Sequence, residues 1–206
     1  MVIAREHALS TPLVILASAS PRRQMLLDQV GIPYRVIPSS AVELQQTGGA
    51  RPETVAIENA RRKAADVAAC VDSGLVLGAD TIVCLDGQIL GKPSGPEQAA
   101  SMLRALSGRE HVVMTGIALC CQPSGAWKFG CETTSVQFKT LHPDEIAAYI
   151  ASGEPLDKAG AYGIQGRAGL FIARISGCYG NVVGLPLGLL RDLLRELGHT
   201  PWTRTG

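Results

Sequence analysis

Residues 13–23 read LVILASASPRR, a pattern in which a buried strand runs directly into the start of a helix. The apolar residues 13–16 predict the strand. Ser20 and Pro21 predict the helix start, because Ser20 can cap free N–H groups and Pro21 suits the first helical position. Arg22 and Arg23 then lie where the helix dipole is already positive. They indicate either a bound anion such as phosphate or two solvated surface side chains.

Composition limits the classes of partner. The chain has 206 residues, 46% of them hydrophobic, which suffices for one sizeable core or for two lobes around one sheet. Its net charge is only +1, so it carries no general electrostatic footprint for nucleic acid or for a membrane surface. Aromatic residues make up 4%, too few for a base-stacking platform. A polyanionic ligand therefore requires a local cluster of cations.

The expected location is cytoplasmic, without a membrane partner. No apolar run approaches the roughly 20 residues that span a bilayer, and residues 1–12 lack the apolar core of a signal peptide. The six cysteines form no CxxC pair, and no histidine lies beside them at metal-ligand spacing. We expect neither a zinc site nor a disulfide framework, and most cysteines are expected in the core of a protein from a reducing compartment.

The order of elements mixes βαβ alternation with hairpins. It predicts an α/β fold with an elongated, mixed β-sheet flanked by helices. Residues 1–206 are interpreted as a single domain with tails at 1–12 and 200–206. A tight hairpin turn is expected at Asp86-Gly87. Strands are expected at 13–16, 33–38, 75–83, 88–90, 112–121, 126–139 and 170–175, and helices at 21–30, 52–71, 96–106, 142–151 and 185–197.

Two carboxylates stand out. Asp80 interrupts the apolar strand at 75–83, where a buried carboxylate is unfavourable unless it is paired or bound to a cation. Gly78 and Ala79 before it leave room for a close ligand. Asp80 is therefore a candidate metal ligand or general base, and the alternative is a carboxylate that caps a neighbouring turn. Glu43 lies in the polar loop after the second strand and is uninformative by itself.

Two lysines and one glutamine are further candidates for ligand binding. Lys92 lies between a glycine and a proline that fix its direction, and Lys63 lies among small alanines on a helix. A solvated hairpin lysine and an ordinary charged helix face are the alternatives. Residues 157–166, DKAGAYGIQG, contain three glycines but match neither GxGxxG nor a GxxxxGK[ST] phosphate loop. They form either a plain loop or a close approach to a ligand, in which Gln165 can present an amide donor and acceptor to a base edge.

Together these residues form the inventory for a triphosphate with one or two divalent cations, because Mg²⁺ prefers carboxylate and phosphate oxygens. The inventory by itself does not separate a hydrolase from a nucleotidyltransferase. Its cations and carboxylates are Arg22, Arg23, Lys63, Lys92, Glu43 and Asp80.

Seven motifs in order resemble the Maf family of nucleoside triphosphate pyrophosphatases. The resemblance runs from about Leu13 to Leu197, nearly the whole chain. One departure is the pair Val42-Glu43, where the family often has Asp-Glu. The motifs are SPRR at 20–23, AxxKA at 60–64, GADT at 78–81, GKP at 91–93, LSG at 106–108, DKAGAYGIQG at 157–166 and VVGLPL at 182–187.

The resemblance implies a two-lobed fold related to the inosine triphosphate pyrophosphatases, with a central cleft. It implies hydrolysis of a nucleoside triphosphate to the monophosphate and pyrophosphate with a divalent cation, Mg²⁺ or Mn²⁺. The catalytic set would be Asp80 as proton acceptor, with Glu43 and Lys92, and the metal would bind Asp80 and Glu43. The phosphates would be held by Ser20, Arg22, Arg23, Lys63 and Lys92.

Substrate choice is carried by Arg22, Thr81 and Gln165 in this resemblance. The segment around Gln165 resembles the branch that acts on dTTP and UTP, whereas a sister branch that acts on 7-methyl-GTP has an acid at that position. The chemistry agrees, because an amide complements the acceptor, donor, acceptor edge of uracil. A carboxylate would favour the donor-rich edge of guanine.

The predicted function is therefore dTTP/UTP pyrophosphatase, consistent with housecleaning of the nucleotide pool. One alternative is a nucleotide-binding regulator of cell division or septum formation, which is disfavoured because no expected catalytic position is lost. The other is a pyrophosphatase for modified nucleotides. The expected partner is the nucleotide, not nucleic acid, and the resemblance leaves room for a homodimer.

Overall fold

The computed structural model describes residues 13–44 and 49–202. Across these residues, seven strands form one mixed sheet with the order β2-β1-β3-β5-β6-β7, and β4 pairs with the end of β3. β1 runs parallel to β2 and β3, and the other pairings are antiparallel. The strands are β1 (Val14–Leu16), β2 (Tyr34–Val36), β3 (Gly74–Leu85), β4 (Gln88–Leu90), β5 (Glu110–Gln122), β6 (Ala126–Phe138) and β7 (Ile172–Ser176).

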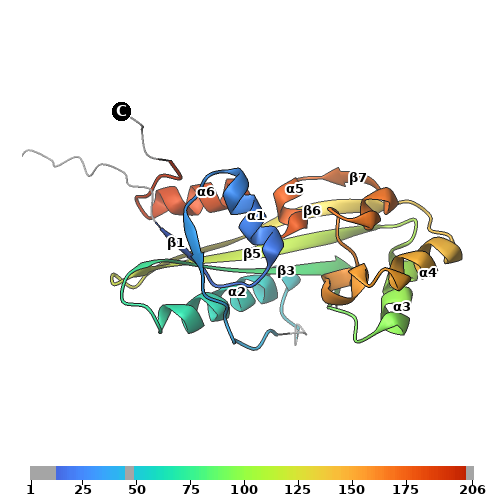
Figure 1. The fold of residues 1–206 in the computed structure, drawn as a ribbon, viewed down its shortest axis with the longest axis horizontal. Coiled ribbons are helices and arrows are strands. Elements are labelled where there is room, and N and C mark those ends of the chain that lie inside the picture. The colour runs from blue at the N-terminus through green and yellow to red at the C-terminus, as the bar shows by residue number, and fades with distance from the viewer. Residues whose placement is uncertain (1–12, 45–48, 203–206) are drawn as a thin grey trace, which may run out of the picture.

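Helices cover both faces of this sheet (Figure 1). Helix α2 packs against β3 and β5, α1 and α6 lie on the opposite face, and α3 packs with α4 at the other end of the elongated molecule. The helices are α1 (Pro21–Gln29), α2 (Pro52–Ala68), α3 (Pro96–Leu106), α4 (Pro143–Ala151), α5 (Tyr179–Val183) and α6 (Leu187–Glu196), with 3₁₀ turns at 154–157, 159–161 and 167–171.

Four apolar clusters are present among the described residues, and the pleat of the strands, which sends alternate side chains to opposite faces, separates those on the two faces of the sheet. Leu75 and Leu77 of β3 pack under α1 and α6, whereas Val76 packs against α2. A further core fills the second lobe, where it contains Val83 and Phe138. Because β3, β5 and β6 are 12, 13 and 13 residues long, they run through both lobes and join them.

This architecture confirms the expected α/β fold with an elongated mixed sheet, flanking helices and two lobes. The hairpin turn lies at Asp86 and Gly87, whose φ angles are 51° and 80°. Helix α5 was not predicted, because its five residues are too few to show a helical period. Residues 170 and 171 were expected to begin the last strand but belong to a 3₁₀ turn, and β7 begins at residue 172.

In the described ranges, no helix is both long enough and apolar enough to cross a membrane. The tail expected at 1–12 lies outside the described residues, as do residues 203–206 of the tail expected at 200–206. Within residues 200–202, the indole Nε1 of Trp202 donates a hydrogen bond to the carbonyl of Val30 at 2.8 Å, which ties this segment to the end of α1.

Candidate active site

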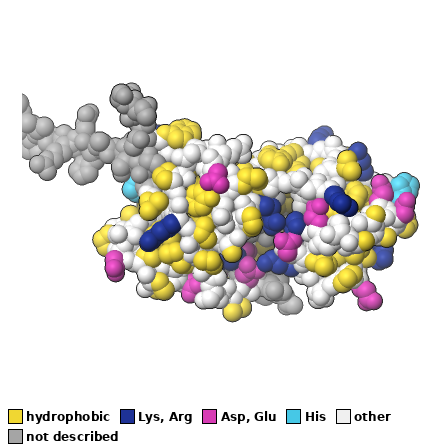
Figure 2. Space-filling view, viewed as in Figure 1, with side chains coloured by type: hydrophobic (Ala, Val, Ile, Leu, Met, Phe, Trp, Pro, Cys, Tyr) yellow, Lys and Arg dark blue, Asp and Glu magenta, His cyan; other side chains and the backbone are white. Residues whose placement is uncertain are grey.

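One cavity of about 520 Å³ between the lobes is lined by every site residue that the sequence predicted. Figure 2 shows Lys and Arg side chains gathered beside Asp and Glu side chains in a hollow at the middle of the molecule. The predicted residues at this cavity are Ser20, Arg22, Arg23, Glu43, Lys63, Asp80, Thr81, Lys92 and Gln165.

Two glycines allow helix α2 to approach the sheet closely at this point. A Cβ on Gly78 would collide with the carbonyl oxygen of Ala60, and a Cβ on Gly116 would collide with the backbone of α2 in the same way. The space beside Asp80, which the sequence suggested for a ligand, is thus occupied by the helix. The close packing brings the side chain of Lys63 against Asp80.

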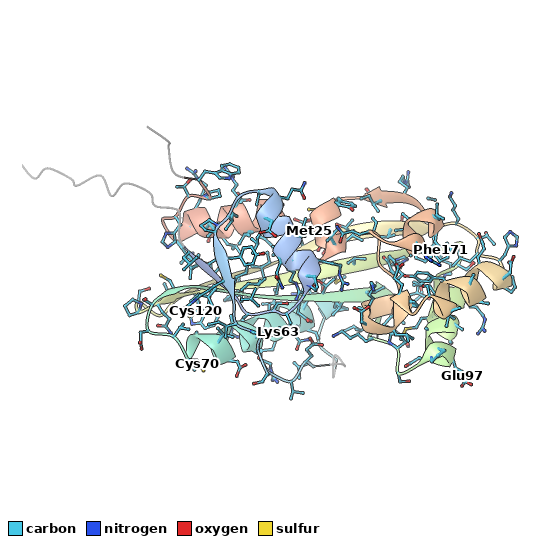
Figure 3. All side chains as sticks on the ribbon, viewed as in Figure 1. Met25, Lys63, Cys70, Glu97, Cys120 and Phe171 are labelled. Atoms are coloured by element: carbon cyan, nitrogen blue, oxygen red, sulfur yellow. The ribbon has the colours of Figure 1, made fainter. Side chains whose placement is uncertain are left out.

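Lys63 holds the two predicted carboxylates together. Its Nζ lies 2.6 Å from Oδ1 of Asp80 and 2.7 Å from Oε1 of Glu43, and it lies 3.4 Å from the carbonyl oxygen of Ala79. The side chains of Lys63 and Asp80 are 11% and 8% exposed. Figure 3 marks Lys63 on α2, beside the central strands. Since a buried charge without a partner is strongly unfavourable, the ammonium of Lys63 stabilises both carboxylates, and the three side chains form one ion-paired unit.

Asn59 also belongs to this unit, and it was missed from the sequence. Its Nδ2 donates to Oδ2 of Asp80 at 2.9 Å and to the carbonyl of Leu44 at 3.1 Å, while its Oδ1 accepts from the N–H of Leu44 at 2.7 Å. Asn59 is 2% exposed. It therefore fastens the residue after Glu43 to α2 and orients Asp80 at the same time. The only sequence signal is its position, one turn before Lys63.

The electrostatics of Glu43 fit a carboxylate that stays ionised. Burial alone would raise the pKa of Glu43, but the hydrogen bond and charge of Lys63, with smaller contributions from Lys92 and Arg23, hold that pKa below its ordinary value. Two adjacent carboxylates suit a hard divalent cation such as Mg²⁺. In the described part of the chain, no group of three or more His, Cys, Asp and Glu side chains could hold a metal ion.

Helix α1 begins at the cavity without a side-chain cap. Ser20 occupies the N-cap position, but its hydroxyl makes no capping hydrogen bond, so the cap expected from the sequence is absent. The Nη1 of Arg22 lies 3.9 Å from Oδ2 of Asp157, and the Arg22 side chain is 34% exposed. An uncapped helix N-terminus with a hydroxyl and a guanidinium beside it can bind a phosphate group.

Arg23 has a different environment. Its Nε donates to the carbonyl of Gly184 at 2.9 Å, and its two terminal nitrogens donate to the hydroxyls of Ser18 and Thr81 at 2.8 and 3.3 Å. Burial lowers the pKa of Arg23. These bonds tie α1 to β3 and to the segment before α6. A direct contact between Arg23 and phosphate stays a prediction.

Lys92 lies at the rim of the cavity, where it is exposed. The carbonyl of Gly91, the preceding residue, accepts a hydrogen bond from the N–H of Gly160 at 3.1 Å. This bond joins the hairpin that carries Lys92 to the glycine-rich segment 157–166. Two segments far apart in the sequence are thereby held on the same side of the cavity.

Gln165 is exposed in a turn of that segment. Its Nε2 lies 4.0 Å from Sδ of Met25, which Figure 3 marks on α1. The turn packs closely against Glu154. A Cβ on Gly166 would collide with the carboxylate of Glu154, and this carboxylate accepts a hydrogen bond from the N–H of Arg167 at 3.1 Å. The amide of Gln165 is thus available to a ligand in the cavity.

Comparison with known proteins identifies a family and similar relatives. The model of the family described as Maf-like protein matches residues 13–197. The dTTP/UTP pyrophosphatase of Pelotomaculum thermopropionicum is 47% identical over 90% of this chain and 97% of its own. The proteins of the same name from Moorella thermoacetica and Thermococcus onnurineus are each 49% identical, over 93% and 90% of this chain and 98% of their own. A solved structure, the Ham1 protein of Staphylococcus aureus, matches 61% of this chain and 71% of its own with a TM-score of 0.44 and 18% identity, too distantly to bear on function.

Proposed function

This chain belongs to the Maf family, and from that premise we propose that it hydrolyses dTTP and UTP to the nucleoside monophosphate and pyrophosphate. Relatives that match over nearly their entire length carry the name dTTP/UTP pyrophosphatase. The observation that carries the proposal is the meeting of two groups in one cavity: the open start of α1 with Arg22, and the unit of Glu43, Lys63 and Asp80.

We propose that water attacks the α-phosphorus and that the bond from the α-phosphorus to the oxygen bridging it to the β-phosphate breaks, so that pyrophosphate leaves. In this proposal Asp80 accepts the proton of the attacking water. The N–H groups at the start of α1, with Ser20, Arg22 and Lys92, bind phosphate oxygens and stabilise the charge of the transition state. Arg23 holds α1 in the required position through its bonds to β3 and to Gly184.

A divalent cation, Mg²⁺ or Mn²⁺, fits the donors that the cavity presents. Asp80 and Glu43 would hold it, and it would neutralise phosphate charge when bound. The remaining ligands would be phosphate oxygens and water, which is how Mg²⁺ is commonly bound beside nucleotides.

We propose that Gln165 recognises the base and that Arg22 and Thr81 complete the specificity set. The amide of Gln165 matches a uracil or thymine edge, and Thr81 acts through its bond to Arg23. Replacing the amide by a carboxylate strands a polar group of the pyrimidine, which can change discrimination strongly. Gln165→Glu is therefore expected to lower kcat/KM for UTP more than for 7-methyl-GTP. An unchanged ratio, with both values falling equally, would assign Gln165 to loop architecture.

The deciding experiment is pyrophosphate release measured as kcat/KM over a panel of dTTP, UTP, CTP, GTP, 7-methyl-GTP and modified pyrimidine nucleotides. We expect dTTP and UTP to be the best substrates. Asp80→Asn should lose about 100-fold or more in kcat per folded molecule, the scale of a removed general base. Binding without turnover would favour the regulator, and a preferred modified nucleotide would favour the other alternative.

We further propose that the chain works in the cytoplasm. All six cysteines lie in the described residues and are free thiols. Free thiols are typical of proteins kept in a reducing compartment. Fractionation of cells that express the tagged chain tests this location.

A further inference from the structure

The ammonium group of Lys63 occupies the gap between the two carboxylates that would hold a divalent cation. One oxygen of Asp80 and one of Glu43 bond to it at 2.6 and 2.7 Å. The second oxygen of Asp80 accepts from Asn59 at 2.9 Å. A divalent cation bound to these carboxylates would therefore compete with the ammonium of Lys63 for the same oxygens.

We propose that Lys63 keeps free divalent cations out of the nucleotide-free site, so that the cation enters together with the nucleotide. The inference rests on the proposed function and specifies the form of its substrate, a metal–nucleotide complex. Lys63 thereby has two sets of partners, the carboxylates before binding and phosphate oxygens afterwards.

The energetic argument concerns what happens to a displaced ammonium. Lys63 is 11% exposed, and its only further acceptor within reach is the carbonyl of Ala79 at 3.4 Å among the residues that the structure describes. A free cation that took the carboxylates would leave the ammonium poorly paired and poorly hydrated, which is strongly unfavourable. Phosphate oxygens offer it charge-assisted hydrogen bonds in exchange. Cation and nucleotide therefore bind with positive coupling, and the coupling is reciprocal.

The test is a titration of the full-length, nucleotide-free protein with Mn²⁺, followed by the electron paramagnetic resonance signal of the free ion. Lys63→Gln removes the ammonium and keeps the length of the side chain. We expect this variant to bind Mn²⁺ about tenfold or more tightly than the wild type, the scale of a lost charge-assisted hydrogen bond. Mn²⁺ should also raise the thermal midpoint of the variant more than that of the wild type.

Two control variants test whether the gain in Mn²⁺ affinity arises at the carboxylates beside Lys63. Arg62→Gln removes the same charge from the next position of α2, where Arg62 pairs with Glu58 at 3.1 Å outside the cavity, and it should leave Mn²⁺ affinity unchanged. Adding Glu43→Gln to Lys63→Gln should abolish the gain, because it removes one of the two carboxylates. An equal gain in Mn²⁺ affinity in Arg62→Gln would show that the lower net charge of the protein causes the gain, and it would overturn the proposal.

Tight Mn²⁺ binding by the nucleotide-free wild type, equal to that of Lys63→Gln, would also overturn it. If Lys63→Gln and a second variant, Lys63→Met, both fail to fold, the wild type decides with α,β-methylene-UTP as the probe. The Mn²⁺ affinity of the protein is measured with and without the analogue and corrected for Mn²⁺ bound by the free analogue. A higher affinity with the analogue supports the proposal, and an unchanged affinity contradicts it. No turnover enters these measurements. Lack of pyrophosphate release would refute the proposed function, whereas equal Mn²⁺ affinity in the wild type and Lys63→Gln would refute the exclusion of free cations by Lys63, so the two failures are distinguishable.

Discussion

Arg22 and Arg23 are adjacent in the sequence, but they face different surroundings because successive residues of a helix point about 100° apart. Arg23 turns into the protein, where it is 8% exposed and uses its three guanidinium nitrogens on neighbouring groups. Arg22 faces the cavity and approaches Asp157 at 3.9 Å. Arg23 therefore fixes the helix to its neighbours, whereas Arg22 faces the cavity, where we propose that it binds phosphate.

Alanine at each position should separate these roles. Arg22→Ala is expected to lower kcat/KM for UTP by about 10- to 100-fold, the scale of a charge-assisted bond, with little change in stability. Arg23→Ala removes the donor to the buried Gly184 carbonyl and one of the two donors to the Ser18 hydroxyl, and it should reduce the free energy of unfolding by about 1–3 kcal/mol. Urea unfolding and steady-state kinetics on both variants check this. The assignment fails if Arg22→Ala is the less stable of the two.

Asn59 offers a second prediction at this scale, because one side chain holds both Asp80 and the backbone of Leu44. Asn59→Ala should lower kcat/KM by about tenfold through the lost orientation of Asp80 and Glu43. The amide N–H of Leu44 should exchange faster with solvent, since it loses its acceptor. Hydrogen exchange read by NMR measures that amide directly.

The matched control for Asn59 is Asp66→Asn. Asp66 lies on the same helix and accepts from Ser39 and Ser40, at the start of the same loop, but it does not contact Asp80. It should loosen the loop at those serines and lower kcat/KM less than Asn59→Ala does. Equal losses of kcat/KM in the two variants would assign Asn59 to loop stability alone.

The sequence identified the charged residues of the cavity because each lies in a short motif with an unusual residue for its context. Asp80 interrupts an apolar strand, and Arg22 opens a helix. Asn59 was not identified from the sequence because its hydrogen-bond partners are brought to it by the tertiary structure. Leu44 lies 15 residues away in the sequence and Asp80 lies 21 residues away. Nothing local marks such a contact. The pairing of Lys63 with two carboxylates was hidden for the same reason.

At the scale of elements, most helices and strands could be predicted because proline and glycine mark their ends. Proline begins α1, α2, α3 and α4. The approach of α2 to β3 could not be predicted, because Gly78 in a strand is equally consistent with a nearby ligand, a bulge or a helix. The structure assigns that space to the backbone of α2.

This approach makes Gly78 a sensitive position. Gly78→Ala sets a methyl group against the carbonyl oxygen of Ala60, which is backbone and cannot rotate away. We expect a loss of about 1–3 kcal/mol in the free energy of unfolding, as for an overpacked core. Activity should fall as well, because α2 carries Lys63. The measurements are urea unfolding and pyrophosphate release.

Gly188→Ala is the matched control within α6. A Cβ there meets nothing within 4 Å. Alanine in a helix is favoured over glycine by about 0.5–1 kcal/mol, so this variant should be neutral or more stable. If both alanine variants behaved alike, the close contact between α2 and β3 would not be a determinant of stability.

At the scale of the whole molecule, the long strands β3, β5 and β6 run through both lobes, and the cavity lies where the two lobes meet. The core of the second lobe reaches the cavity through Tyr162, whose hydroxyl lies 2.7 Å from Nε2 of His111. His111 is 2% exposed and stacks edge-on against Phe138 and Tyr162. Burial lowers the pKa of His111 from 6.5 to about 4. The fold thus holds a neutral imidazole at neutral pH.

This histidine should make stability depend on pH above the range in which carboxylates titrate. Because its pKa is lower in the folded state, the unfolded chain binds the proton first, and the stabilisation present above pH 6.5 is lost as the pH falls toward 4. We expect a loss of about 2 kcal/mol in the free energy of unfolding between about pH 7 and about pH 5. Urea unfolding across that range measures it. His111→Gln should flatten the dependence, whereas His142→Gln, at an exposed histidine, should leave it intact. A wild-type protein equally stable at both pH values would show that burial of His111 is not coupled to folding in this way.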